Sequence, residues 1–368
     1  SRLVAREFRW LNPTLSDLYA PSSLSSTLRV MASLASTDED VALWSIDVSD
    51  AYLQVPQDEP KILKVQGRDQ HGKSMSYKIM FNLPGQRCGA RGWYQYFADK
   101  LHEVKVEPYV AAPAIFAGPG VALSSHVDDA QLMGGVPQGE DLTRHLESCG
   151  LKLKVEGPAF VNKGKVRFLK RTFEGTPNGF VIYQEDRYVN KLLEILALKD
   201  AKTKSTPWPA GGEKRKGDKE NEPLDAKDHA AFRTCVGVLL YISPDRVDIQ
   251  WSVKQLASAV QSPTQGDLAD LRHLAKYLKG TANWGILFPP VSAGQSFRDR
   301  DPADQRRSAF RFPSLIESVS DADWAPAGER VGRRSTSGAG VYLNSHMLWS
   351  SSRTQKFITL SSMESEYM

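Results

Sequence analysis

Two acidic segments, about eighty residues apart, contain the side chains best suited to chemistry. The first begins at Asp47 and the second ends in the pair Asp128 and Asp129. Carboxylate oxygens are the ligands that Mg²⁺ prefers. Two divalent ions bridged by carboxylates about 4 Å apart can stabilise both the attacking and the leaving oxygen of a phosphoryl transfer. The segments therefore predict a site for two Mg²⁺ ions, or Mn²⁺ in their place, with these three aspartates as catalytic residues and metal ligands.

The residues around the aspartates predict the elements that must position them. An apolar run at residues 41–46 predicts a strand that ends at Asp47. Strand-like runs at 121–125 and 131–133 lie on either side of the Asp-Asp pair and predict a hairpin with the carboxylates at its tight turn. An Asp-Asp pair alone is more often plain turn chemistry. Its pairing with the Asp47 segment favours the metal site.

Composition excludes several classes of protein. With 368 residues, 41% hydrophobic and 24% charged, the chain can form domains with real cores and is not disordered throughout. No apolar run approaches the roughly 20 residues of a membrane span, and no signal peptide is visible, so we expect an intracellular protein without a membrane partner. The three cysteines lack CxxC or His-pair spacing, which indicates neither a disulfide framework nor a zinc site. The net charge of +4 favours a polyanionic partner only weakly.

The rest of the chain alternates between helical, strand-like and linker patterns. Residues 168–173 and 180–183 predict a second hairpin, and 188–198 a helix. Apolar residues at helical spacing predict helices over 228–242, 245–261 and 268–278. Residues 199–227 are rich in Lys, Glu, Pro and Gly and predict a flexible basic linker, and 291–313 predicts another. A β-rich segment follows.

Several motifs resemble one family in the same order along nearly the whole chain. The segments at 47–56, 83–94 and 126–129 resemble the polymerase motifs of reverse transcriptases. Those at 2–6, 188–193, 236–241, 277–281 and 320–325 are similar to the Pol polyprotein of copia-type LTR retrotransposons. The resemblance implies an α+β, right-hand polymerase with fingers and palm, then a helical thumb or connection region and an incomplete ribonuclease H-like domain. The first residue is Ser, and the last residues break off within an apparent helix, so we expect a fragment of a longer polyprotein.

The resemblance assigns roles residue by residue. It implies that Asp47, Asp128 and Asp129, with Val48, bind the metal ions, and that a bulky ring at Tyr52 excludes the 2′-hydroxyl of ribonucleotides. His126 replaces the usual Tyr, and Gln86-Arg87-Cys88 replaces the usual Leu-Lys-Gln. A primer contact and a structural role for His126 are both open. The residues implied to bind nucleotide or template are Arg2, Asp50, Ala51, Tyr52, Gln86, Arg87 and Gly89.

In the last segment, Asp321 and Glu364 match the first two metal carboxylates of a ribonuclease H site. The others lie downstream in the family, so we expect no RNA hydrolysis by this fragment. The domains implied are 1–198 for fingers and palm, without the start of the fingers, 199–227 linker, 228–290 thumb or connection, 291–313 linker and 314–368 ribonuclease H-like.

The leading hypothesis is RNA- and DNA-directed DNA synthesis, with an RNA template, a DNA primer or duplex and dNTPs as partners, in a cytoplasmic particle or the nucleus. A catalytically silent nucleic-acid-binding remnant of a decayed element is the alternative. An RNA-dependent RNA polymerase is a third, disfavoured by Tyr52. The sequence specifies no oligomeric state.

Overall fold

The computed structural model describes residues 4–5, 7, 18–68, 70–209, 221–291, 315–324 and 333–367. They form two compact units, one within residues 1–31 and 38–169 and the other within 32–37 and 170–368.

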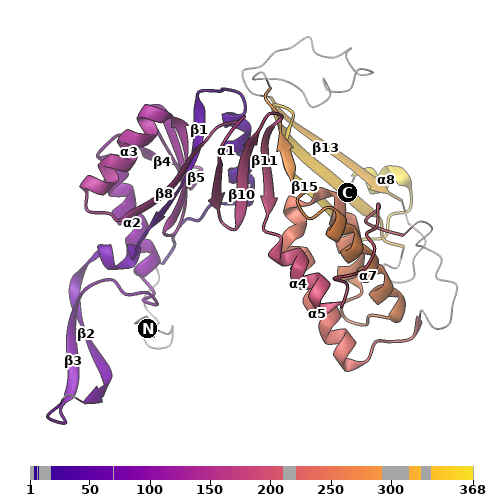
Figure 1. The fold of residues 1–368 in the computed structure, drawn as a ribbon, viewed down its shortest axis with the longest axis horizontal. Coiled ribbons are helices and arrows are strands. Elements are labelled where there is room, and N and C mark those ends of the chain that lie inside the picture. Colours follow the sequence, from indigo (N-terminus) through magenta and orange to yellow (C-terminus); the bar gives the residue numbers. More distant parts are fainter. Residues whose placement is uncertain are drawn as a thin grey trace. The chain divides into compact units, whose positions relative to one another are not determined.

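An antiparallel six-stranded sheet forms the centre of the first unit, in the order β4-β5-β6-β7-β1-β8 (Figure 1). The predicted strand before Asp47 is β1, and the predicted hairpin is β6 and β7. β2 and β3 pair as a separate two-stranded ribbon. The strands of this unit are β1 (Val41–Val48), β2 (Pro56–Arg68), β3 (Ser74–Phe81), β4 (Glu107–Tyr109), β5 (Ala112–Gly118), β6 (Val121–His126), β7 (Asp129–Gly135), β8 (Leu153–Ala159) and β9 (Lys165–Phe168).

Helices α2 (Gly89–His102) and α3 (Val136–Ser148) cover one face of this sheet. Alternate residues of a strand point to opposite faces, and Trp44 and Ile46 of β1 share a buried core with Trp93 and Phe97 of α2 and with α3. Asp47 therefore points to the opposite face. Helix α1 (Ser25–Ala35) precedes β1, and a single 3-10 turn, η1 (Ala51–Gln54), follows it.

The second unit contains a short antiparallel sheet and a helical core. β10 (Arg171–Thr176) and β11 (Gly179–Gln184) form the predicted second hairpin, and β12 (Ile286–Phe288) pairs with β11. One apolar core is shared by α4 (Arg187–Ile195), α5 (Ala226–Ile242), α6 (Gln250–Ser258) and α7 (Gln265–Gly280). A capping box starts α7, since the Asp267 carboxylate accepts from Thr264 N at 2.8 Å and Thr264 Oγ1 accepts from Asp267 N at 3.4 Å.

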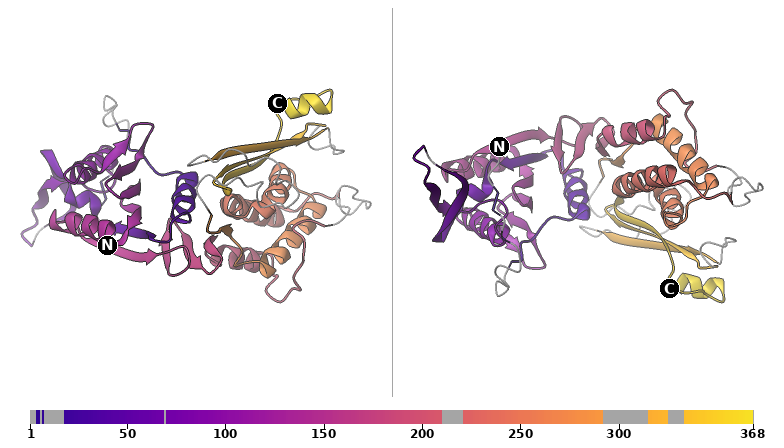
Figure 2. Two further views of the ribbon diagram at one scale, coloured as in Figure 1. Left: turned by 90° about the horizontal axis from the view of Figure 1, so that it is seen from above. Right: turned by 90° about the horizontal axis from the view of Figure 1, so that it is seen from below.

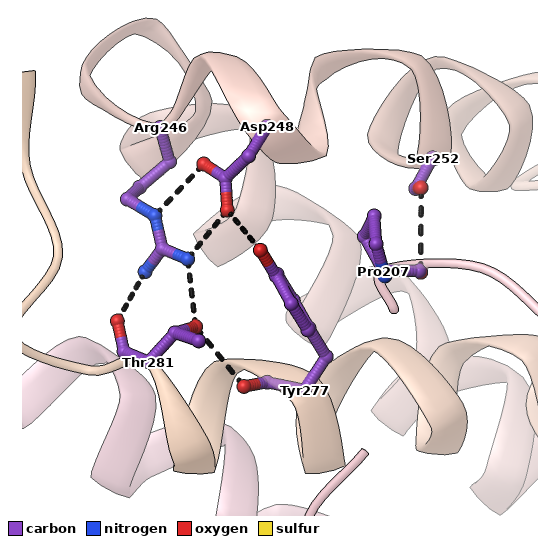
Figure 3. A network of polar contacts seen from close by, with 6 residues as sticks. All are labelled: Pro207, Arg246, Asp248, Ser252, Tyr277 and Thr281. Atoms are coloured by element: carbon purple, nitrogen blue, oxygen red, sulfur yellow. Dashed lines mark hydrogen bonds and ion pairs between the residues drawn. The ribbon is translucent and has the colours of Figure 1, made fainter. Parts of the chain in front are cut away.

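Helix α6 is shorter than the 245–261 predicted from its apolar spacing. Residues 243–249 instead form two 3-10 turns, η3 (Ser243–Asp245) and η4 (Val247–Ile249), separated at Arg246, whose backbone takes φ −126° and ψ 78°. Its buried guanidinium makes two hydrogen bonds to Asp248, at 3.0 and 2.7 Å, and two to Thr281, both 2.8 Å (Figure 3). Tyr277 donates to Asp248 at 2.8 Å. This network joins η4 to the end of α7.

The last described elements form a three-stranded antiparallel sheet, β13 (Ile316–Asp323), β14 (Thr336–Leu343) and β15 (His346–Thr354), followed by α8 (Ser362–Tyr367). Figure 2 shows the yellow strands of this sheet beside the orange helices, and Lys254 of α6 donates to Thr336 Oγ1 at 2.6 Å. The β-rich pattern and the apparent helix expected in this last segment are therefore confirmed as elements.

The chain is thus a mixed helix and sheet protein, as expected. In the ranges that the structure describes, no helix is both long and apolar enough to cross a membrane.

Candidate active site

The first unit brings two of the three predicted catalytic aspartates into one cross-strand row. Asp47 of β1 lies opposite Asp129 of β7, and Asp129 lies opposite His126 of β6. On its other side, Asp47 lies opposite Lys154 of β8. Directly opposed residues in an antiparallel sheet point to the same face. The four side chains therefore form a polar row on the face of the sheet that α2 and α3 leave uncovered.

Asp128 belongs to the two-residue turn between β6 and β7, and this turn is held from two sides. Trp93 Nε1 donates to the Val127 carbonyl at 2.5 Å, and Val48 N donates to the Asp128 carbonyl at 2.9 Å. Val127 takes φ 59°, which is uncommon for a β-branched residue. Strained backbone of this kind often marks functional sites. The hydrogen bonds fix the turn to the end of β1 and to α2.

Lys154, a residue that no motif in the sequence singles out, forms an ion pair with Asp47. Lys154 Nζ lies 2.9 Å from Asp47 Oδ2, and both side chains are exposed. The hydrogen bond to Asp47, the charge of Asp47 and, less strongly, the charge of Asp50 raise the pKa of Lys154 above its ordinary value. A cation thus already accompanies this carboxylate. A regular strand pattern carries no signal for such a cross-strand partner, so only the register reveals it.

The three aspartates provide the hard oxygen donors that Mg²⁺ binds. Their carboxylate oxygens do not all come within 4.8 Å of one another; among the described residues, only Glu103, His145 and Cys149 form a group that meets that distance. The donor chemistry of the three aspartates fits divalent ions, and Lys154 would compete with them for Oδ2 of Asp47.

Tyr52 lies at the same end of the sheet. Asp50, with φ 54°, opens the η1 turn, and Ala51 is buried. A Cβ placed on Gly89 would come within 3.0 Å of the Tyr52 ring, so Gly89 allows the ring to lie against the start of α2. Burial, and then the charge of Asp128, raise the pKa of Tyr52. Predicted residues from three segments therefore meet here.

Gln86 makes hydrogen bonds within its own loop. Its Oε1 accepts from Leu83 N at 2.9 Å, and its backbone carbonyl accepts from Gly89 N at 3.2 Å. The backbone N–H of Arg87 donates to Glu7 Oε2 at 3.0 Å. Arg2 lies outside the described residues.

His126 is anchored by a residue that was not predicted. Ser22 Oγ lies 2.6 Å from His126 Nδ1, and residues 22 and 126 form an isolated bridge. The two residues are 104 positions apart in the sequence, so no local pattern indicates that they pair.

In the last segment, Asp321 lies in β13 and Glu364 in the first turn of α8. Glu364 Oε2 accepts from Leu360 N at 2.7 Å, so this carboxylate bonds to the loop just before its own helix. Glu366 is the residue that reaches β13, where it accepts from Ala322 N at 3.0 Å.

Comparison with known proteins finds relatives that align with the whole chain. No family model matches the chain. It is 26% identical over 377 residues to the retrovirus-related Pol polyprotein from transposon RE1 of Arabidopsis thaliana, an alignment that covers 100% of this chain and 23% of that protein. It is 24% identical over 387 residues to the corresponding polyprotein from transposon TNT 1-94 of Nicotiana tabacum, covering 100% of this chain and 26% of that protein.

The chain therefore spans about a quarter of the length of these curated relatives. Among solved structures, a foamy viral protease–reverse transcriptase in complex with double-stranded DNA matches with a TM-score of 0.53 and 12% identity, over 97% of this chain and 50% of that one. At this identity the likeness concerns the fold alone. Together with the aligned relatives, it confirms the predicted resemblance: the whole chain is homologous to the retrovirus-related Pol polyproteins of copia-type transposons.

Proposed function

We propose that this chain is the reverse transcriptase region of a copia-type transposon and performs RNA- and DNA-directed DNA synthesis. The observation that carries the proposal is the row in which Asp47 faces Asp129, next to the anchored turn that bears Asp128. In this proposal residues 1–198 are fingers and palm, 228–290 a helical thumb or connection, and 314–368 a ribonuclease H-like domain, with linkers at 199–227 and 291–313. The protein would work inside the cell, in a cytoplasmic particle or the nucleus.

Each residue of the site has a role in this proposal. Asp47, Asp128 and Asp129, with the backbone of Val48, hold the divalent ions, and these, when bound, supply the charge that stabilises both oxygens of the phosphoryl transfer. Lys154 balances the charge of Asp47 until then. The ring of Tyr52, held against Gly89, lies beneath the sugar of the incoming dNTP and excludes a 2′-hydroxyl.

The RNA template and DNA primer are gripped mainly through phosphates, so binding weakens as salt rises and depends little on sequence. Gln86, Arg87 and Gly89 border the nucleotide, and Gln86 acts by keeping its loop closed. Ser22 holds Nδ1 of His126. The other ring nitrogen then remains for the primer backbone.

Primer extension tests the proposal. The full chain is supplied with a poly(rA) template, an oligo(dT) primer, dTTP and Mg²⁺, and incorporation is measured. Asp128→Asn should reduce incorporation by at least ~100-fold, because the charge that the metal ions require is worth several kcal/mol of transition-state stabilisation. Asp141→Asn on the exposed side of α3 is the matched control, since it makes the same change in an Asp that pairs only with Arg144 on the surface.

The alternatives predict different results in the same assay. A silent remnant binds the template-primer in a filter or fluorescence assay without incorporation, and Asp128→Asn then changes nothing. An RNA polymerase uses rUTP in preference to dTTP. Retained duplex binding by Asp128→Asn shows that its loss of incorporation is chemical rather than a failure to fold.

A further inference from the structure

Three metal-binding side chains converge on the other side of the sheet, in the helix layer. Glu103 is the C-cap residue of α2, and His145 and Cys149 lie one turn apart at the end of α3. Cys149 Sγ lies 3.6 Å from Glu103 Oε2 and 3.6 Å from His145 Nε2, and the last two atoms are also 3.6 Å apart. The three ligand atoms thus form an equilateral triangle.

This triangle has the dimensions of a zinc site. Its centre lies about 2.1 Å from each corner, and zinc binds Cys sulfur at about 2.3 Å, and His nitrogen and carboxylate oxygen at about 2.0–2.2 Å. A zinc ion slightly above the plane would reach all three atoms and keep a fourth, outward position for water.

The surrounding backbone also favours a cation. Helices α2 and α3 both end here, and the carboxyl end of a helix carries a partial negative charge. Lys100 pairs with Oε1 of Glu103 at 2.8 Å, which leaves Oε2 facing the cluster. His145 Nε2 lies 2.9 Å from the backbone carbonyl of Lys100, within hydrogen-bond distance. A metal would replace that hydrogen bond and leave Nδ1 as the protonated ring nitrogen.

We propose that Glu103, His145 and Cys149 form a three-ligand zinc site, with water in the fourth position, that ties the carboxyl ends of α2 and α3 together. The site does not share residues with the row of Asp47 and Asp129, and α2 and α3 pack on the sheet face opposite to these aspartates. Zinc binding at this site therefore affects the stability of the helix layer. The proposal that the chain is a polymerase does not depend on it.

Metal titration tests this inference. The full chain is first stripped of metal with a chelator and then titrated with Zn²⁺ in competition with a chromophoric chelator. Excess Mg²⁺ is present so that Zn²⁺ does not bind at the aspartates. We expect one zinc per chain and, with Co²⁺ instead, a sulfur-to-metal charge-transfer band, which only a thiolate ligand produces. Zinc at about 100 times its Kd should raise the thermal midpoint by roughly 5–10 °C.

Variants separate the cluster from other sites. Cys149→Ser and His145→Gln should weaken zinc binding by more than about 100-fold, because changes in the second coordination shell alone cost ~10–100-fold. Cys88→Ser and His102→Gln are matched controls, since they change the same residue types at the start and end of α2 and should bind as wild type does. Equal stoichiometry in Cys149→Ser, or no charge-transfer band in the wild type, overturns the proposal.

Discussion

At the scale of single residues, the site depends on partners that come from distant parts of the chain. Asp47, Asp128 and Asp129 could be predicted from the sequence because each lies directly beside a strand-like run of residues. The sequence did not reveal Lys154, Trp93 or Ser22, because each acts through a cross-strand or tertiary contact. Of the proposed zinc ligands, the spacing of His145 and Cys149 by four residues is visible in the sequence, but Glu103 joins them only through packing.

Lys154 provides a prediction at this scale. Lys154→Met removes the ammonium group that lies 2.9 Å from Asp47. A metal ion then no longer competes with the lysine for this carboxylate. We expect Mn²⁺ to bind about 3–10-fold more tightly, as judged by the electron paramagnetic resonance of free Mn²⁺, since charges near a protein surface interact modestly. Lys152→Met removes the same charge two residues earlier and serves as the control. Unchanged affinity in Lys154→Met would mean that the ion pair does not compete with metal.

At the scale of elements, most helices and strands followed from the sequence pattern, and their boundaries were the least predictable feature. The strand before Asp47, both hairpins and helices α5 and α7 are confirmed. The start of α6 was wrong because the apolar residues at helical spacing begin only at Ile249, and nothing in residues 245–248 marks the 3-10 turns that precede Gln250. The side chain of Arg246 bonds to Asp248 and Thr281 just before α6 begins. The sequence around Arg246 does not indicate these bonds, because Thr281 lies 35 residues away.

The Arg246 network predicts an acid-sensitive contribution to stability. Burial raises the pKa of Asp248, but the hydrogen bond and charge of Arg246 outweigh it, so the pKa lies below its ordinary 3.8. A carboxyl with a lowered pKa stabilises the folded state above the unfolded pKa, and this stability is lost as pH falls through the folded pKa. The affected window therefore begins near pH 4 and extends downward.

We expect Asp248→Asn to lower the free energy of unfolding by about 2–4 kcal/mol at pH 7, because it leaves the buried Arg246 short of its charged partner. Urea denaturation at several pH values measures this difference. The difference should narrow as pH falls from about 4 through the lower pKa of the folded Asp248 carboxyl, which then becomes protonated. Asp200→Asn, an exposed residue of the same unit, should change stability little at any pH. A difference that stays constant down to pH 2 would show that charge is not its origin.

At the scale of the whole molecule, each of the two compact units has its own apolar core. The aspartate row and the proposed zinc cluster belong to the first unit, and the Arg246 network belongs to the second. A sequence pattern predicts where cores can form but not which elements share one, because that depends on pairings such as β1 between β7 and β8.

Hydrogen exchange measured by mass spectrometry should separate these effects. Asp248→Asn should speed exchange in α5, α6 and α7 and leave β1, β6 and β7 unchanged, because the network belongs to the helical core of the second unit. Zinc should slow exchange in α2 and α3 alone. If Asp248→Asn speeds exchange equally across both units, they unfold as one cooperative body.

The bond from Trp93 to the turn has a practical consequence. The indole proton of Trp93 lies in a hydrogen bond to the carbonyl directly before Asp128. In a chain with 8 tryptophans, the indole region of an NMR spectrum holds few signals, and Trp93→Phe would assign this one. Its chemical shift would follow any movement of the turn as ions, primer or nucleotide arrive, without a label on any of them.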